Sequence, residues 1–202
     1  MIKRPYILGL TGSIGMGKSS TAKLFADRGI PVWDADATVH QLYSGDTPAV
    51  RQIAAMLPEA VENNVVNRET LKAAIAKDQS ILQKLEQIVQ PLIAQSRADF
   101  VADARDNDED MVIIDHPLLL ESKSERYSDG VLVVTIDAAE QRRRVLERGT
   151  MDEKTLEIIL AKQMPDAEKR KRADFIVETT TPESAKQQVE AVIAKIKDSL
   201  NA

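Results

Sequence analysis

The chain has 202 residues, of which 43% are hydrophobic and 29% are charged, and its formal net charge is −5. This length suits one domain with a sizeable core, and the acidic balance argues against a general nucleic-acid binder, which needs an electropositive face. The absence of cysteine excludes disulfides, thiolate metal sites and cysteine nucleophiles. No stretch approaches the roughly 20 apolar residues that span a membrane. We therefore expect a cytoplasmic protein with no nucleic-acid or membrane partner, working as a monomer or a small homo-oligomer.

The first motif with chemical content is a glycine-rich loop. Residues 12–19 match G-x-x-x-x-G-K-[ST], after an apolar run and before a helical segment that Gly29 ends. In such a loop the backbone N–H groups bind phosphates, Lys18 reaches the β- and γ-phosphates, and the hydroxyl of Ser19 binds Mg²⁺. A purely structural turn is the alternative. The predicted nucleoside triphosphate site consists of Gly12, Ser13, Ile14, Gly15, Met16, Gly17, Lys18, Ser19 and Ser20.

Short apolar segments alternate with helical patterns along the whole chain. These expected strands are Ile7–Leu10, Pro31–Asp34, Met111–Asp115, Val131–Ile136 and Phe175–Val177. The alternation predicts an α/β fold with a parallel sheet and helices on both faces. In such folds ligands bind at the carboxyl edge of the strands.

The segment between the second and third expected strands, residues 38–105, shows helical patterns and no clear strand. Asn67 is a candidate N-cap for a helix over Arg68–Ala76. Pro91 should kink this region or begin a new helix. We therefore predict a core at about 1–36 and 109–202, with a helical lobe for a second substrate inserted at about 37–108.

Carboxylates follow two of the expected strands. Asp34 and Asp36 close the second strand, where alternation would point both side chains the same way. One carboxylate could then accept a proton from a substrate hydroxyl while the other orients Mg²⁺ or the substrate. Alternatively, Asp36 only caps the next helix. Asp115 ends the third strand at the position of a Walker-B acid, which binds Mg²⁺ directly or through water.

Two further segments carry possible substrate contacts. Residues 117–121 read Pro-Leu-Leu-Leu-Glu, and the leucines could wall an apolar pocket for a base or a pantetheine arm, or form ordinary core. Basic clusters at 142–148 and 169–172 stand out in an acidic chain. Because cations stabilise a transferring phosphoryl group, residues 142–172 are predicted to form a mobile lid. A solvated helix face with balancing acidic residues would explain only some of these charges.

These motifs, in this order, resemble those of the dephospho-CoA kinase family over about residues 6–180. The family's second signature is an apolar strand end that runs into Asp-Ala-Asp, here residues 34–36. Its Pro-Leu-Leu-aromatic-Glu motif is matched by residues 117–121, with Leu120 in place of the aromatic residue. Its lid and closing-strand pattern is matched by Gln141, Arg144, Arg148, Gln163 and Ala173-Asp174. The chain departs from the family pattern at two places. The family usually has a histidine before the proline, where this chain has Gln90, and it has Asn-Gly after the last strand, where this chain has Thr179-Thr180.

The resemblance implies a P-loop NTPase fold of the nucleoside-monophosphate-kinase type, with a five-stranded parallel sheet, an acceptor lobe and a lid. It implies that ATP, with Mg²⁺ as cofactor, phosphorylates the ribose 3′-hydroxyl of dephospho-CoA. Asp36 would be the general base, and Lys18 and Arg148 would stabilise the transferring group. The other implied roles are acceptor binding by Asp34, Arg68, Leu118, Leu119 and Glu121, lid contacts by Arg144, Gln163 and Lys169, and Mg²⁺ binding by Ser19 and Asp115.

Two other functions fit parts of the pattern. One is a different small-molecule or nucleotide kinase of the same fold, which spacing alone does not distinguish. The other is a regulatory nucleotide switch, although the chain lacks the Asn-Lys-x-Asp motif with which guanine-binding switches read the base.

Overall fold

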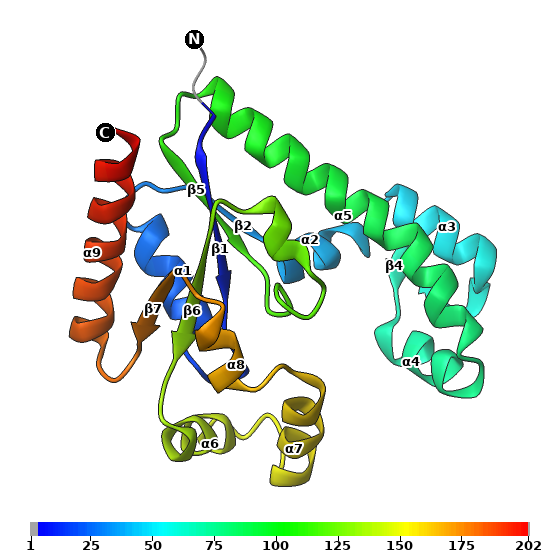
Figure 1. Cartoon of the computed structure of the whole chain (residues 1–202). Helices are drawn as coiled ribbons and strands as arrows, with labels where there is room; N and C mark the ends of the chain where they lie inside the picture. The colour runs from blue at the N-terminus through cyan, green and yellow to red at the C-terminus, as the bar shows by residue number, and fades with distance from the viewer. Residues whose placement is uncertain (1–3, 202) are drawn as a thin grey trace. The chain divides into compact units, whose positions relative to one another are not determined.

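The computed structural model describes residues 4–201 (Figure 1). Residues 1–3 and 202, which belong to the predicted core range, lie outside the described residues. The chain divides into two units, which we describe separately. The first contains the described residues up to Trp33 and from Asp103 onward, and the second contains Asp34–Ala102. Within residues 4–201, no helix combines the length and the hydropathy that a membrane crossing requires.

The strands and helices follow the alternation expected from the sequence. The strands are β1 (Tyr6–Thr11), β2 (Val32–Asp34), β3 (Val61–Glu62), β4 (Val65–Val66), β5 (Met111–Asp115), β6 (Gly130–Thr135) and β7 (Phe175–Glu178). The helices are α1 (Lys18–Ala26), α2 (Ala35–Leu42), α3 (Pro48–Met56), α4 (Arg68–Lys77), α5 (Ser80–Asp106), α6 (Ala138–Glu147), α7 (Glu153–Lys162), α8 (Asp166–Lys171) and α9 (Pro182–Leu200). Short 3-10 helices occupy Pro58–Ala60 and Ser124–Tyr127.

The main sheet has five strands in the order β2-β5-β1-β6-β7. Strand β1 pairs in parallel with β5 on one side and with β6 on the other, and β7 adds in parallel to β6. The register places Leu10 opposite Asp115 and Thr11 opposite Val133, so the ends of β1, β5 and β6 meet at one edge. The predicted five-stranded parallel sheet is therefore confirmed.

Both faces of this sheet are buried, as its uniformly apolar strands predict. In β6, Leu132 and Val134 join the core cluster that α1 and α9 cover, and Figure 1 shows these two helices together. Val131 and Val133 point to the opposite face and pack with Leu120 of the segment that follows β5. Because side chains alternate along β6, this one strand contributes residues to a separate hydrophobic cluster on each face of the sheet.

The second unit has its own hydrophobic core and an element that the sequence analysis missed. Ile53 and Ala60 are fully buried in a cluster shared by α3, α4 and α5. Strands β3 and β4 form a small antiparallel hairpin, which corrects the expectation that residues 38–105 contain no strand. Asn63 and Asn64 connect these strands at φ 51° and 59°. Two consecutive positive φ values characterise the tight hairpin turn that asparagine tolerates, so the Asn-Asn pair was the available signal.

In the second unit, the start of α4 agrees with the sequence prediction, whereas no helix begins at Pro91. Asn67 caps α4 as predicted, its Oδ1 accepting hydrogen bonds from the backbone N–H groups of Glu69 and Thr70 at 3.1 Å. Pro91, however, lies inside α5, which continues from Ser80 to Asp106. The alternative that a new helix begins at this proline is therefore wrong.

Candidate active site

The glycine-rich loop leaves β1 at the carboxyl edge of the sheet and enters α1. Gly17 is the N-cap of α1 at φ 91°, and no side chain of the described residues caps this helix end. Gly15 has φ 79°, and a Cβ there would lie 2.5 Å from Cγ2 of Val145. The first N–H groups of α1 therefore carry a partial positive charge without a protein acceptor, which is the arrangement that binds phosphate.

Two glutamines hold the peptide groups of Ile14 in this loop. Gln141 of α6 donates from Nε2 to the carbonyl oxygen of Ile14 at 2.7 Å. Gln163, the C-cap of α7, accepts the N–H of Ile14 through Oε1 at 3.2 Å. The predicted lid residue Gln163 therefore contacts the phosphate loop directly.

A threonine after β7 holds the other half of the loop. Thr179 donates from Oγ1 to the carbonyl oxygen of Met16 at 2.8 Å, and Arg144 donates to the carbonyl oxygen of Thr179 at 2.7 Å. Arg144 is thus linked to the loop through Thr179. This contact of Thr179 could not be predicted from the sequence, because no local pattern signals a partner 163 residues away.

Lys18 and Asp115 form an ion pair at the edge of the sheet. The distance from Nζ to Oδ1 is 2.5 Å, and the side chains are 14% and 2% exposed. Because β1 and β5 are neighbours, the residue that ends β5 lies beside the loop that follows β1. The structure therefore brings together the two residues that were predicted to serve the phosphates and the metal.

The oxygen donors at this position fit Mg²⁺. Ser19 offers an exposed hydroxyl at the start of α1, and Asp115 offers a carboxylate. Among residues 4–201, no three His, Cys, Asp or Glu side chains are grouped as metal ligands. Mg²⁺ in kinases is usually held by one or two protein oxygens together with substrate phosphates and water, so two donors suffice.

Most arginines of the first basic cluster are already paired. Arg142 forms ion pairs with Glu153 and Glu157, and Arg143 bonds Glu140 at 2.7 Å. Hydrogen bonds from Arg143, and then from Arg144, lower the pKa of Glu140 to about 2.

Arg148 differs from these paired arginines. It is the exposed C-cap of α6 and forms no ion pair with the described residues. Arg148 is therefore the cation of this helix that is available to a ligand.

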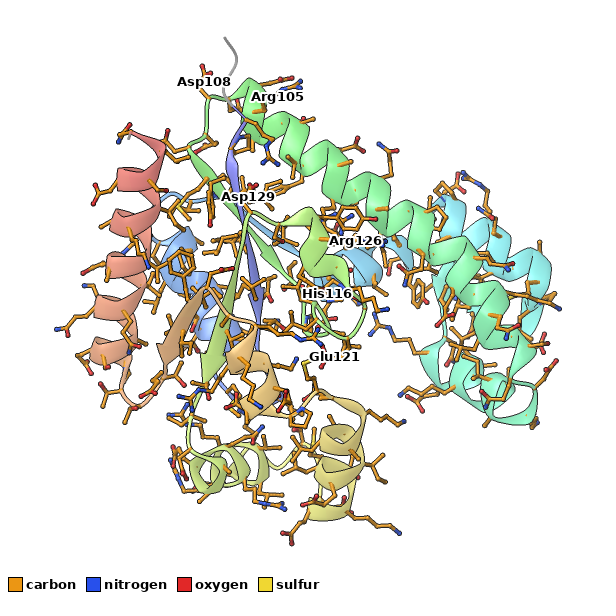
Figure 2. All side chains as sticks on the ribbon, viewed as in Figure 1. Arg105, Asp108, His116, Glu121, Arg126 and Asp129 are labelled. Atoms are coloured by element: carbon orange, nitrogen blue, oxygen red, sulfur yellow. The ribbon has the colours of Figure 1, made fainter. Side chains whose placement is uncertain are left out.

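The three leucines after β5 do not together form the apolar pocket wall that the sequence suggested. Leu118 is 43% exposed, whereas Leu119 and Leu120 are 1% and 2% exposed and belong to the core. Leu119 is therefore a packing residue, because its side chain already fills the space beside Gly9. His116, labelled in Figure 2, accepts the N–H of Leu118 through Nδ1 at 3.1 Å and so holds the turn that follows β5.

Glu121 and Lys169 are also placed differently from the prediction. Lys169 is fully buried, and its Nζ lies 2.8 Å from Oε1 of Glu121. Lys169 is thus an interior cation and not an exposed lid residue, whereas a contact of Glu121 with an acceptor stays a prediction. Burial raises the pKa of Glu121, but hydrogen bonds from Lys169 and from the N–H of Met164 outweigh this, so that its pKa lies below the usual value.

A cavity opens beside the loop at the carboxyl ends of β6 and β7. It has a volume of about 580 Å³, and Thr180, the neighbour of the loop-binding Thr179, contributes to its wall. Its lining residues are Thr135, Ile136, Asp137, Glu140, Arg170, Glu178 and Thr180. The cavity is large enough for a small aromatic ligand.

In the second unit, Asp34 and Asp36 do not share a strand face. Strand β2 ends at Asp34, whose Oδ1 accepts the N–H of Ala37 at 2.9 Å as the N-cap of α2. Asp36 is exposed in the first turn of that helix. The shared strand face and the cap by Asp36 are therefore wrong, because β2 ends at Asp34 and Asp34 is the capping residue. The role of a carboxylate as general base stays a prediction.

Arg68, the predicted acceptor contact, lies at the exposed first position of α4. Its guanidinium carbon is 5.6 Å from the centre of the Tyr43 ring, within cation–π range. The stacking orients the guanidinium without neutralising it, so Arg68 can still bind an anion.

The sheet order, the glycine loop and the Lys18–Asp115 pair define a P-loop kinase. Comparison with known proteins narrows this class. The chain belongs to the dephospho-CoA kinase family, because the family model of that description matches residues 6–184.

Individual relatives cover nearly the full length of the chain. It is 51% identical to a dephospho-CoA kinase of Cereibacter sphaeroides over 98% of this chain and 100% of that protein. It is also 51% identical to a dephospho-CoA kinase of Bradyrhizobium diazoefficiens, over 94% of this chain and 95% of the relative. A similar solved structure is that of TT1252 from Thermus thermophilus, with a TM-score of 0.79, 30% identity, and coverage of 96% of this chain and 98% of that one. The family resemblance inferred from the sequence is therefore confirmed.

Proposed function

We propose that the protein transfers the γ-phosphoryl group of ATP to the ribose 3′-hydroxyl of dephospho-CoA, releasing CoA and ADP. The observation that carries the proposal is the uncapped N-terminus of α1 beside Lys18, in a chain whose relatives of equal length bear the name dephospho-CoA kinase. A cytoplasmic location is part of the proposal and agrees with a chain that contains no cysteine.

In the proposed reaction the 3′-oxygen attacks the γ-phosphorus, the bond to the β–γ bridging oxygen breaks, and ADP leaves. The carboxylate of Asp36 accepts the hydroxyl proton. Lys18 and Arg148 stabilise the charge on the transferring oxygens, for which Arg148 is suited because no described carboxylate neutralises it.

Ser19 and Asp115 would hold Mg²⁺, since a hydroxyl and a carboxylate are the hard donors that this ion prefers. When bound, the ion neutralises charge on the β- and γ-phosphate oxygens. Asp115 already holds Lys18, so the same carboxylate orients the lysine that meets the phosphates.

We assign the adenosine of ATP to the cavity beside Thr180, because the neighbouring Thr179 binds the phosphate loop. For the acceptor, Asp34, Arg68 and Leu118 are the proposed contacts. Arg68 suits a phosphate of dephospho-CoA, and the exposed Leu118 suits an apolar part of it.

A coupled assay of ADP release tests this function. We expect rapid turnover with dephospho-CoA and turnover at least about 10²-fold slower with nucleoside monophosphates, because only the correct acceptor aligns its hydroxyl with the γ-phosphorus. The Lys18→Met variant serves as the control for contaminating kinases. Turnover with a nucleoside monophosphate that equals turnover with dephospho-CoA would refute the assignment.

A further inference from the structure

A buried ion pair connects the segment after β5 with α8, and the carboxylate of this pair also binds the segment between α7 and α8. Nζ of Lys169 lies 2.8 Å from Oε1 of Glu121 and 3.3 Å from the carbonyl oxygen of Pro117. The same Oε1 accepts the backbone N–H of Met164 at 2.8 Å. Figure 2 shows Glu121 between the loop after β5 and these two helices. The pair therefore fixes the backbone at Met164.

The residue before Met164 touches the phosphate loop. Gln163 accepts the N–H of Ile14, whose carbonyl oxygen is bound by Gln141. Because Gln163 and Met164 share a peptide bond, a displacement of Met164 moves the glutamine as well. The residue that Glu121 binds, Met164, is thus adjacent in the chain to the residue that binds the phosphate loop, Gln163.

We infer that Glu121 and Lys169 are positioning residues for the phosphate loop, an inference that rests on the phosphotransfer proposed above. They hold Met164 so that Gln163 stays on the N–H of Ile14, which fixes the Ser13–Ile14 peptide group at the start of the phosphate loop. Preorganised donors stabilise a transition state only if they are held in place before the reaction.

Two arguments indicate that the Glu121–Lys169 pair orients Gln163 and does not serve the stability of the fold alone. A buried ion pair contributes little net stability, because desolvation offsets the attraction between the charges. In addition, Oε2 of Glu121 is buried and has no hydrogen-bond partner among the described residues. A carboxylate that leaves one oxygen unsatisfied is a poor device for stability alone.

The test replaces both charges in the full chain, Glu121→Leu together with Lys169→Met, so that no unpaired charge remains in the interior. We expect the variant to fold with a melting temperature lowered by no more than about 10 °C, because no unpaired charge remains, although the N–H of Met164 and the carbonyl oxygen of Pro117 each lose a partner. Hydrogen exchange of the Ile14 amide, followed by NMR without ligands, should become at least about tenfold faster. With ATP and dephospho-CoA, kcat should fall at least about tenfold while ATP affinity stays within about threefold.

A matched control replaces an exposed pair of the same helix, Glu168→Leu with Lys171→Met. It should leave both Ile14 exchange and kcat unchanged. If Ile14 exchange and kcat in the Glu121/Lys169 variant equal those of the wild type, the pair serves folding only and the inference is wrong.

Two further variants keep the inference open to refutation. Glu121→Gln preserves the side-chain shape, so it covers the case in which the double variant does not fold. It weakens the acceptor for Met164, and unchanged Ile14 exchange in it would overturn the inference.

Gln163→Ala should lower kcat as the double variant does, and combining all three changes should add no further loss, because they act through one contact. Losses that multiply would contradict this.

Failure of the proposed function is distinguishable from failure of the inference. The exchange of the Ile14 amide is measured without substrates, so it tests the mechanical link whatever the acceptor is. Absence of turnover with dephospho-CoA in the wild type would refute the function and leave the exchange result intact.

Discussion

The ammonium group of Lys18 and the carboxylate of Asp115 lie 2.5 Å apart, although the two residues are 97 positions apart in the chain. The parallel pairing of β1 with β5 brings them together. The lysine is therefore held at the carboxyl edge of the sheet before any phosphate arrives, by the carboxylate that we propose as a metal ligand.

Replacing Lys18 should affect folding as well as catalysis. In Lys18→Met the carboxylate of Asp115 loses a partner in a mostly buried position but keeps further interactions. We expect the free energy of unfolding to fall by about 1–3 kcal/mol, measured by chemical denaturation. In the control Lys23→Met, which breaks an exposed pair with Asp27, the loss should be below about 0.5 kcal/mol. Equal losses in both variants would show that the Lys18–Asp115 pair is not special to the fold.

The capping role of Asp34 can be separated from its proposed contact with the acceptor. Asp34→Ala should lower the free energy of unfolding by about 1 kcal/mol, because the N–H of Ala37 loses its partner, whereas Asp34→Asn retains the cap. Both variants should raise KM for dephospho-CoA if the carboxylate charge contacts the acceptor. An unchanged KM in both would limit Asp34 to capping α2.

Asp36 has no capping role, so its replacement should act on the reaction alone. In Asp36→Asn we expect kcat to fall at least about 10²-fold with little change in ATP affinity, the usual scale for loss of a general base. The free energy of unfolding should change by less than about 0.5 kcal/mol, because the side chain is exposed. Steady-state kinetics and ATP titration measure these effects, and near-normal turnover would exclude Asp36 as the base.

The arginines of α6 offer a matched pair of variants. Arg148→Ala should lower kcat at least about tenfold and change ATP affinity less, because its charge acts on the transferring group. Arg143→Ala removes an equally charged residue that Glu140 and Glu147 already bind, so kcat should stay near the wild-type value. Similar kinetics for the two variants would show that Arg148 has no distinct role.

Local patterns predicted the parts of this protein that depend on local chemistry. The apolar strands of the main sheet, three to six residues long, the phosphate-loop spacing and the Asn67 cap are each readable within a few positions, and each lies in the structure where the sequence placed it. The end of the second strand at Asp34 was predicted correctly, but the continued alternation to Asp36 was wrong, because a strand and a capped helix turn accommodate Asp34-Ala35-Asp36 equally well.

Which side chains are buried could not be predicted from the sequence at several positions. Lys169 stands in a run of four basic residues, where solvent exposure is the usual outcome, yet it is fully buried because Glu121 reaches it from a distant segment. Leu118 and Leu119 are adjacent and chemically identical, but only the second faces the core. Such differences arise from tertiary packing and leave no trace in spacing or composition.

The most direct test of the proposed reaction is the position of the new phosphate, determined by ³¹P and ¹H NMR on the product formed from ATP and dephospho-CoA. Our account predicts one phosphomonoester, coupled to the proton on the ribose 3′-carbon, formed together with one equivalent of ADP. A phosphate on the 2′-oxygen, or ATP hydrolysed to inorganic phosphate with dephospho-CoA recovered unchanged, would contradict it.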